Sequence, residues 1–290
     1  MERLDKDFCH DLIDLHVHAS PCIYERIGNE LDISERARGL GYRAILFKCH
    51  HTLNADRAFL IRKTLPGFEV HGGFVLNYFV GGINPEAVEA AIMSGAKEVW
   101  MPVFHSDHRI KKFGHPGLPN LRPVKEVTRH NKVWKGISIL NSAGEIIPEL
   151  REILCMIADE DIILGTGHLG LEEIFPLIDA AKREGVKKVL ITHPEHILTG
   201  WPIEDQVRMA DMGAVIEHCY VTANLDRVAN SIIAVGPKRC VMATDGGTMK
   251  LPPPTEIMKT FAEEMLMRGI TEKDIETMTK TNPTRLLSLT

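Results

Sequence analysis

The sequence lacks any uninterrupted apolar run long enough to cross a bilayer, and its first residues, Met1 to Asp11, are charged rather than apolar. We therefore expect a cytoplasmic protein with no membrane partner. A strong excess of either charge is also missing, because 34 Lys and Arg residues stand against 39 Asp and Glu residues. The resulting net charge of −5 is too small to indicate a nucleic-acid surface, so we expect no nucleic-acid partner.

Close cysteine pairs, internal repeats and low-complexity linkers are absent as well. The spacing of the cysteines fits neither a zinc ribbon nor a disulfide scaffold, so we expect reduced and mostly buried thiols. Without a linker, the 290 residues, of which 44% are apolar, are expected to form one domain over residues 1–290. The six cysteines are Cys9, Cys22, Cys49, Cys155, Cys219 and Cys240.

Short apolar runs alternate with amphipathic stretches along nearly the whole chain, which is typical of repeated βα units around a parallel sheet. Several of the predicted helices are followed by a glycine stop signal, at Gly95, Gly185 and Gly213. The predicted helices are Ile33 to Leu40, Ala55 to Thr64, Pro85 to Ser94, Leu171 to Glu184, Ile203 to Met212 and Leu225 to Ala234. The eight predicted strands are Leu12 to His18, Arg43 to His50, Phe68 to Leu76, Glu98 to His105, Ile162 to His168, Lys188 to His193, Ala214 to His218 and Arg239 to Asp245.

Eight such units predict an α/β fold, a (β/α)8 TIM barrel; the alternative architecture is a doubly wound open sheet. The alternation is broken between Ser106 and Pro148, which we interpret as an insertion after strand four. Within this insertion, Val133 to Leu140 is expected to form a short strand or hairpin.

The polar residues fall at one end of the predicted strands. Six strands end in histidine and the eighth ends in Asp245. In a barrel, the active site lies at the carboxyl ends of the strands, so these side chains should converge. Residues two apart in a strand share a face, so His16 and His18 can bind one cation together, with Asp14 as a supporting carboxylate deeper on that face.

Strands five, six and eight end in the same way, with His168, His193 and Asp245. A carboxylate that leaves an apolar strand is costly to bury unless it meets a cation or strong donors, which favours Asp245 as a metal ligand. Imidazole and carboxylate ligands suit Zn, and also Mn, Fe or Ni. The sequence therefore predicts a divalent metal site formed by His16, His18, His168, His193 and Asp245.

With these residues in place, the chain resembles the amidohydrolase superfamily, the metal-dependent hydrolases related to phosphotriesterases and dihydroorotases. The resemblance depends on the His16-Val17-His18 motif and on His168, His193 and Asp245, which follow in that order. A further feature is the segment Asn282-Pro283-Thr284-Arg285-Leu286-Leu287, which resembles the segment that often begins the closing helix of these enzymes.

The resemblance implies that His16, His18 and Asp245 hold one metal, and that His168 and His193 hold a second or contact the substrate. It also implies that Asp245 is catalytic and accepts the proton of a water activated by the metal. A divalent ion lowers the pKa of water from about 15.7 towards about 7, which makes hydroxide available at neutral pH.

One departure from the family leaves the number of ions open between one and two. Two-metal members usually have a bridging carboxylated lysine or a glutamate at the end of strand four, where this chain has Trp100 to His105. Lys48 and His50, on one face at the end of strand two, are candidates for substrate binding. A carbamylated Lys48 is an alternative bridge, because a lysine in a crowded cationic site has a lowered pKa.

The remaining polar residues give weaker predictions. His105 and His218 are further candidates for substrate contact, whereas His51 and His196 have no strand-end position and are expected in surface loops. The basic segment from Arg109 to His115 forms either a solvated loop or a positive lid over the mouth.

The function favoured by these features is hydrolysis of an amide, ester, lactone or phosphoester bond in a small-molecule substrate. A metal-dependent decarboxylase, another lyase or an isomerase on the same barrel is an alternative, because a fold does not fix a reaction. A non-catalytic barrel that binds a metal and a ligand is a third alternative. The sequence leaves homo-oligomer formation open, although such barrels often pair through their outer helices.

Overall fold

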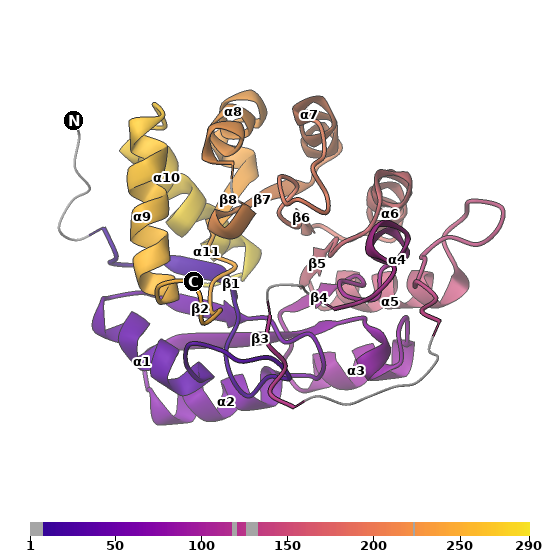
Figure 1. Ribbon diagram of the computed structural model, residues 1–290, viewed down its shortest axis with the longest axis horizontal. Helices are drawn as coiled ribbons and strands as arrows, with labels where there is room; N and C mark the ends of the chain where they lie inside the picture. Colours follow the sequence, from indigo (N-terminus) through magenta and orange to yellow (C-terminus); the bar gives the residue numbers. More distant parts are fainter. Residues whose placement is uncertain (1–7, 118–120, 126–132, 223) are drawn as a thin grey trace.

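The computed structural model describes residues 8–117, 121–125, 133–222 and 224–290. Its eight strands are all parallel and follow one another around a single sheet in the order β1 to β8, with helices outside the ring (Figure 1). The predicted (β/α)8 barrel is therefore confirmed. The strands are β1 (Ile13–Val17), β2 (Ala44–Phe47), β3 (Glu69–Val75), β4 (Glu98–Trp100), β5 (Ile163–Gly165), β6 (Val189–Ile191), β7 (Val215–Cys219) and β8 (Cys240–Ala243).

Each strand is followed by a helix that packs its apolar face on the sheet, and an additional helix, α4, lies in the insertion after β4. Three predicted glycine stop signals, Gly95, Gly185 and Gly213, have positive φ, as expected of residues that end helices. None of the helices in the described ranges has the length and apolar character needed to span a membrane. The helices are α1 (Glu30–Gly39), α2 (Ala55–Thr64), α3 (Pro85–Met93), α4 (Asp107–Phe113), α5 (Pro148–Asp159), α6 (Leu171–Arg183), α7 (Ile203–Asp211), α8 (Leu225–Val235), α9 (Pro254–Met267), α10 (Glu272–Glu276) and α11 (Asn282–Leu286).

The insertion differs from the prediction in one respect. The segment Val133 to Leu140 forms no strand; its residues contribute only two isolated bridges, Ser106 with Ile137 and Leu140 with Ile146. The physical reason is that these bridges connect the loop to residues on either side of it, so no two neighbouring runs of backbone are paired along their length.

The interior of the barrel is apolar at one end. All eight strands contribute at least one side chain to an inner cluster, and Leu286 of α11 and Leu287, the next residue, also belong to it. The largest member is Trp100 of β4, which fits because its neighbours are glycines. A Cβ at Gly73 on β3 or at Gly165 on β5 would lie 2.3 Å from the indole ring. Because this apolar cluster fills the rest of the barrel interior, the polar groups of a site are expected at the carboxyl ends of the strands.

The barrel closes between its last and first strands through few but specific contacts. Val17 pairs in parallel with Gly246, and the His18 amide donates to the Gly246 carbonyl at 2.8 Å. Asp14 adds a second connection, because its carboxylate accepts from the Thr244 amide at 3.1 Å and from the Thr244 hydroxyl at 2.6 Å. The ends of β1 and β8 are thereby held side by side.

Candidate metal centre

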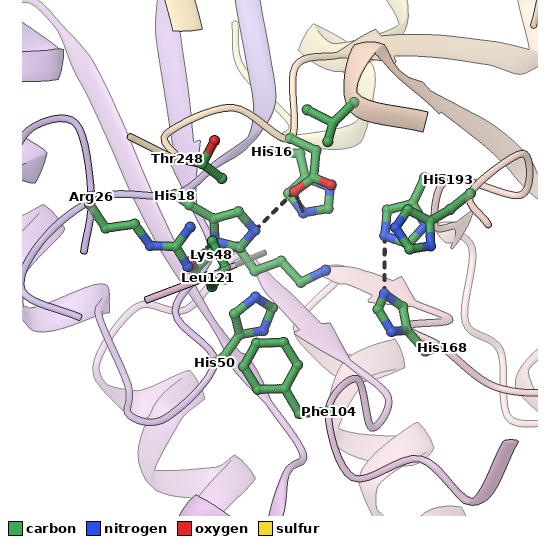
Figure 2. Close-up of a pocket in the computed structure, with 13 residues that line it drawn as sticks. His16, His18, Arg26, Lys48, His50, Phe104, Leu121, His168, His193 and Thr248 are labelled. Atoms are coloured by element: carbon green, nitrogen blue, oxygen red, sulfur yellow. Dashed lines mark hydrogen bonds and ion pairs between the residues drawn. The ribbon is translucent and has the colours of Figure 1, made fainter. Parts of the chain in front are cut away.

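A cavity of about 150 Å³ opens at the carboxyl ends of the strands (Figure 2). Most of its wall is polar or aromatic, and it brings together side chains from the ends of β1, β2, β5, β6 and β8. The lining residues are His16, His18, Arg26, Lys48, His50, Phe104, Leu121, His168, His193, His196, Val221, Asp245 and Thr248.

His16 and His18 both direct their Nε2 atoms at one oxygen of Asp245. The Nε2 to Oδ1 distances are 3.2 Å for His16 and 3.0 Å for His18. The opposite nitrogens are already engaged, with His16 Nδ1 at 3.1 Å from Glu217 Oε2 and His18 Nδ1 at 2.8 Å from the Lys48 carbonyl. Both of these partners are acceptors, so each Nδ1 carries the proton and donates it.

The tautomer set by these partners leaves a lone pair on each Nε2 when the imidazoles are neutral. Burial, together with the charge of Arg26, lowers the pKa of His18 to about 3, so His18 is neutral at physiological pH. Two lone pairs and a carboxylate oxygen within about hydrogen-bond distance repel one another unless a cation lies among them. The three side chains therefore fit a divalent ion by the chemistry of their donors, and orientation of a ligating histidine by a carboxylate or carbonyl is the usual arrangement in metal sites.

The backbone around these ligands is held in a particular shape. The register of β1 against β2 shifts between Asp14 and Val17, and the Asp14 carboxylate stabilises this irregularity by accepting from the His16 amide at 3.2 Å. Asp245 has a φ of 49°, an unfavourable value for a residue with a side chain. Such local strain persists only where surrounding contacts impose it, and here the contacts between β1 and β8 do so.

His168 and His193 form a second pair beside the first group. Their Nε2 atoms lie 3.2 Å apart, both side chains are buried, and the His193 ring stacks on His16 with 5.8 Å between ring centroids. In the described chain, the Nδ1 atoms of His168 and His193 have no hydrogen-bond partner, in contrast to those of His16 and His18. The structure thus brings all five predicted ligands together, but it orients the first three more firmly than the last two.

Lys48 extends from the end of β2 into the space between His18 and His168 (Figure 2). Its Nζ is buried, has no hydrogen-bond partner in the described ranges, and lies 5.1 Å from the centre of the Trp100 ring. Burial lowers the pKa of this amine, while the nearby carboxylates of Glu217, Asp245 and Glu98 act in the opposite direction. At the end of β4, the expected position of a bridging ligand, Trp100 faces the barrel interior instead.

His50 lines the cavity next to Lys48. Its ring lies 4.6 Å from that of His18 and 4.1 Å from that of Phe104, so three rings form one aromatic wall of the cavity. This position agrees with the expected place of His50 at the mouth.

Two predicted contact residues lie elsewhere. His105 packs against Tyr78 and Phe79, with ring centroids 5.1 and 4.8 Å away, and His218 is buried at 3.1 Å from Glu195. Neither is among the described residues that line the cavity, because the His105 ring packs between other aromatic side chains and the His218 ring is paired with Glu195 in the loop after β6. Burial lowers the pKa of His218, but the interactions with Glu195 and Cys240 outweigh this effect and raise the pKa to about 10.

The structure also adds residues that the sequence argument missed. Arg26 and His196 line the cavity, although His196 was expected in a surface loop, and Glu217 supports His16 from β7. His196 lies three residues after His193, a spacing that could have drawn attention to it.

Arg109, in the segment considered as a lid, is instead buried, and its guanidinium lies 5.9 Å from the centre of the Phe104 ring.

A family model matches residues 11–217, which is more than half of the chain and includes four of the five candidate ligands. The chain belongs to the family of unknown function DUF6282. No curated protein matches its sequence. Membership of DUF6282 therefore does not indicate which reaction the chain catalyses. The solved structures that follow are compared for their fold.

Solved structures similar to this DUF6282 chain include enzymes of different activities. An amidohydrolase from Pseudomonas aeruginosa has a TM-score of 0.63 at 14% identity, with 97% of each chain covered. The 5-carboxyvanillate decarboxylase LigW from Sphingomonas paucimobilis has a TM-score of 0.57 at 10% identity, covering 97% of this chain and 99% of its own. The N-acetyl-D-glucosamine-6-phosphate deacetylase from Mycobacterium smegmatis has a TM-score of 0.57 at 12% identity, covering 97% of this chain and 76% of its own. The resemblance to the amidohydrolase superfamily is therefore confirmed for the fold.

Proposed function

We propose that this chain is a metal-dependent hydrolase that acts on a small molecule with an amide, ester, lactone or phosphoester bond. The observation that supports this most strongly is the convergence of His16 Nε2 and His18 Nε2 on Asp245 Oδ1, while both Nδ1 atoms are held by acceptors. These three residues would hold one divalent ion, with Zn preferred for imidazole and carboxylate ligands and Mn, Fe or Ni as alternatives. His168 and His193 would hold a second ion or contact the substrate.

A divalent ion in such a site supplies a Lewis acid for a carbonyl or phosphoryl oxygen and a lowered pKa for water. The Asp245 side chain is 16% exposed and faces the cavity, so its carboxylate can accept a proton from water and return it to a leaving group. Phe104 and His50 would hold an apolar or planar part of the substrate. Lys48 offers a positive charge to an oxygen that becomes negative during the reaction.

The first test is metal content, counted as ions per chain in protein without a histidine tag. We expect one or two ions in the wild type and in His115→Ala, a control at an exposed histidine that does not line the cavity. We expect none in His16→Ala. A wild-type protein that binds no ion under metal-replete conditions would overturn the proposal.

The second test concerns Asp245, measured with ester, lactone, amide and phosphoester substrates. Asp245→Asn is expected to lose at least about 100-fold in kcat, in the range typical of general acid–base catalysis. The ion count per chain is measured in the same samples, so that a lost proton acceptor is distinguished from a lost ligand. Unchanged turnover with the ion retained would contradict the role of Asp245.

A second candidate function, a metal-dependent decarboxylase, is supported by a specific observation. Two cationic side chains, Lys48 and Arg26, line the cavity beside the candidate ligands, and a substrate carboxylate needs such a partner. Release of carbon dioxide from small aromatic or aliphatic acids, abolished in Lys48→Met and retained in His115→Ala, would favour this reaction over hydrolysis.

A further inference from the structure

A group of two thiols and an imidazole lies next to the cavity but takes no part in the site described above. We call Cys22, Cys49 and His51 the thiol cluster. Cys22 belongs to the loop after β1, whereas Cys49 and His51 belong to the loop after β2. The His51 ring contacts Cys49, whose Sγ lies 3.4 Å from its Nδ1, and it interacts electrostatically with Cys22 in the other loop.

Cys22 is surrounded by hydrogen-bond donors. Its Sγ accepts from Arg26 Nε at 3.3 Å and from the Tyr24 amide at 3.5 Å. A neutral thiol is a weak acceptor, whereas a thiolate is a strong one, so these two donors favour the charged form.

Arg26 provides an independent argument from charge. Its side chain is buried at 8% exposure, and no carboxylate forms an ion pair with it in the part of the chain that the structure describes. A buried guanidinium without a counter-charge is costly. A Cys22 thiolate beside Arg26 Nε supplies that charge.

The acid–base properties of the cluster agree with this geometry. Burial raises the pKa of Cys22, but the hydrogen bond to His51 and the charge of Arg26 outweigh it and bring the pKa to about 7. The hydrogen bonds to Cys22 and Cys49 raise the pKa of His51 to about 9. Cys155 differs, because burial and its hydrogen bond to Glu184 raise its pKa above 9.0.

We propose that Cys22 is a modification site, a thiolate beside the cavity-lining Arg26 that reacts with peroxides and other small electrophiles, with His51 as its proton donor. In the reaction with a peroxide, the Cys22 sulfur attacks one peroxide oxygen, a sulfur–oxygen bond forms and the oxygen–oxygen bond breaks. The sulfur is oxidised to a sulfenic acid and the peroxide is reduced. The departing hydroxide or alkoxide takes the proton of His51 and leaves as water or an alcohol.

The reaction has a consequence for the cavity. A modified Cys22 no longer offers a negative sulfur to Arg26 Nε, and Arg26 lines the cavity. Oxidation of Cys22 would thus change the electrostatic surroundings of Arg26, a side chain that a ligand in the cavity would contact.

The test is competitive alkylation of the reduced, full-length wild-type protein with substoichiometric iodoacetamide at pH 7, with each cysteine quantified by peptide mass spectrometry. At this pH about half of a thiol with a pKa of about 7 is thiolate, against about 1% of a thiol with a pKa of 9. The lower intrinsic nucleophilicity of the more acidic thiol offsets roughly tenfold of this advantage. We therefore expect Cys22 to react about fivefold faster than Cys155, although Cys155 is the more exposed of the two.

The pH dependence and a peroxide reaction complete the test. The alkylation rate of Cys22 should have its midpoint near pH 7, and hydrogen peroxide with dimedone should give a sulfenic acid adduct at Cys22. Faster alkylation of Cys155 than of Cys22, or a midpoint for Cys22 above pH 8.5, would overturn the proposal. The wild type suffices for these measurements, and they need neither a bound ion nor catalytic turnover.

The role of His51 is tested with His51→Gln and the matched control His115→Gln. His51→Gln should raise the midpoint for Cys22 by more than one pH unit, and His115→Gln should leave it unchanged. An unchanged midpoint in His51→Gln, in protein whose melting temperature matches the control, would contradict the assignment of His51.

Discussion

Gly247 lies where the backbone after β8 packs directly on the residue that follows β1, and its replacement by alanine tests how the candidate metal centre is held together. A Cβ at Gly247 would lie 1.7 Å from the His18 carbonyl oxygen, and the residue has a φ of 119°. Gly213→Ala is a matched control, because Gly213 has a φ of 108° and no described heavy atom lies within 4 Å of its Cβ position.

Both substitutions place a side chain on a backbone with positive φ, and Gly247→Ala alone also creates a steric clash. An unfavourable positive φ costs about 1–3 kcal/mol in each, which corresponds to a fall in melting temperature of roughly 2–4 °C per kcal/mol. In Gly247→Ala, the segment must in addition move by roughly 1.5 Å to reach an ordinary contact distance. That movement separates His18 from Asp245, whose Nε2 and Oδ1 atoms are 3.0 Å apart.

The assay is titration of the metal-free proteins with Zn²⁺ against a competing chelator, beside thermal unfolding of the same samples. Metal–ligand distances tolerate deviations of only about 0.2 Å, so we expect Gly247→Ala to bind zinc on the order of 100-fold more weakly or worse. We expect Gly213→Ala to lose stability alone. Wild-type zinc affinity in Gly247→Ala would refute the reasoning.

Two other perturbations test buried contacts around the site. Glu217→Gln should weaken metal binding by about 10- to 100-fold, because an uncharged amide accepts more weakly from His16 Nδ1 and can also present its NH2 group to it. Chelator competition measures this, and an unchanged affinity would contradict it. Burial lowers the pKa of His218, but the charges of and hydrogen bonds to Glu195 and Cys240 raise it to about 10, above the ordinary value of 6.5. The stability from this pair is complete below pH 6.5 and is lost as pH rises towards 10, with a slope of up to about 1.4 kcal/mol per pH unit. Urea unfolding between pH 6.5 and 10 should show this slope in the wild type and lose it in His218→Gln, and an equal slope in both would exclude the charged pair.

The fold could be predicted from the sequence because each strand and helix is specified mainly by residues that are close together along the chain. Each strand is a short, almost entirely buried run that is rich in apolar residues, and the α2 helix predicted over Ala55 to Thr64 has those same bounds in the structure. The weakest prediction, a strand or hairpin at Val133 to Leu140, failed because a strand also depends on a partner that local sequence does not specify.

The candidate site could be predicted only in part. The position of His16, His18 and Asp245 follows from strand ends that meet at one edge of a barrel. The orientation of their rings does not, because Glu217 and the Lys48 carbonyl come from other strands. Arg26 was missed for the same reason, since it belongs to a loop and no strand pattern indicates where that loop folds.

The barrel closes between β8 and β1, and the candidate ligands come from both sides of that junction. His16 and His18 belong to the first strand and Asp245 follows the last, so one ion would bind residues from nearly opposite ends of the barrel sequence. Bringing such distant segments together has an entropic cost that increases with the length of chain between them. An ion that binds only the closed form shifts the folding equilibrium towards it. Metal supply would then determine how much of this protein is present as an intact barrel, as well as how active that barrel is.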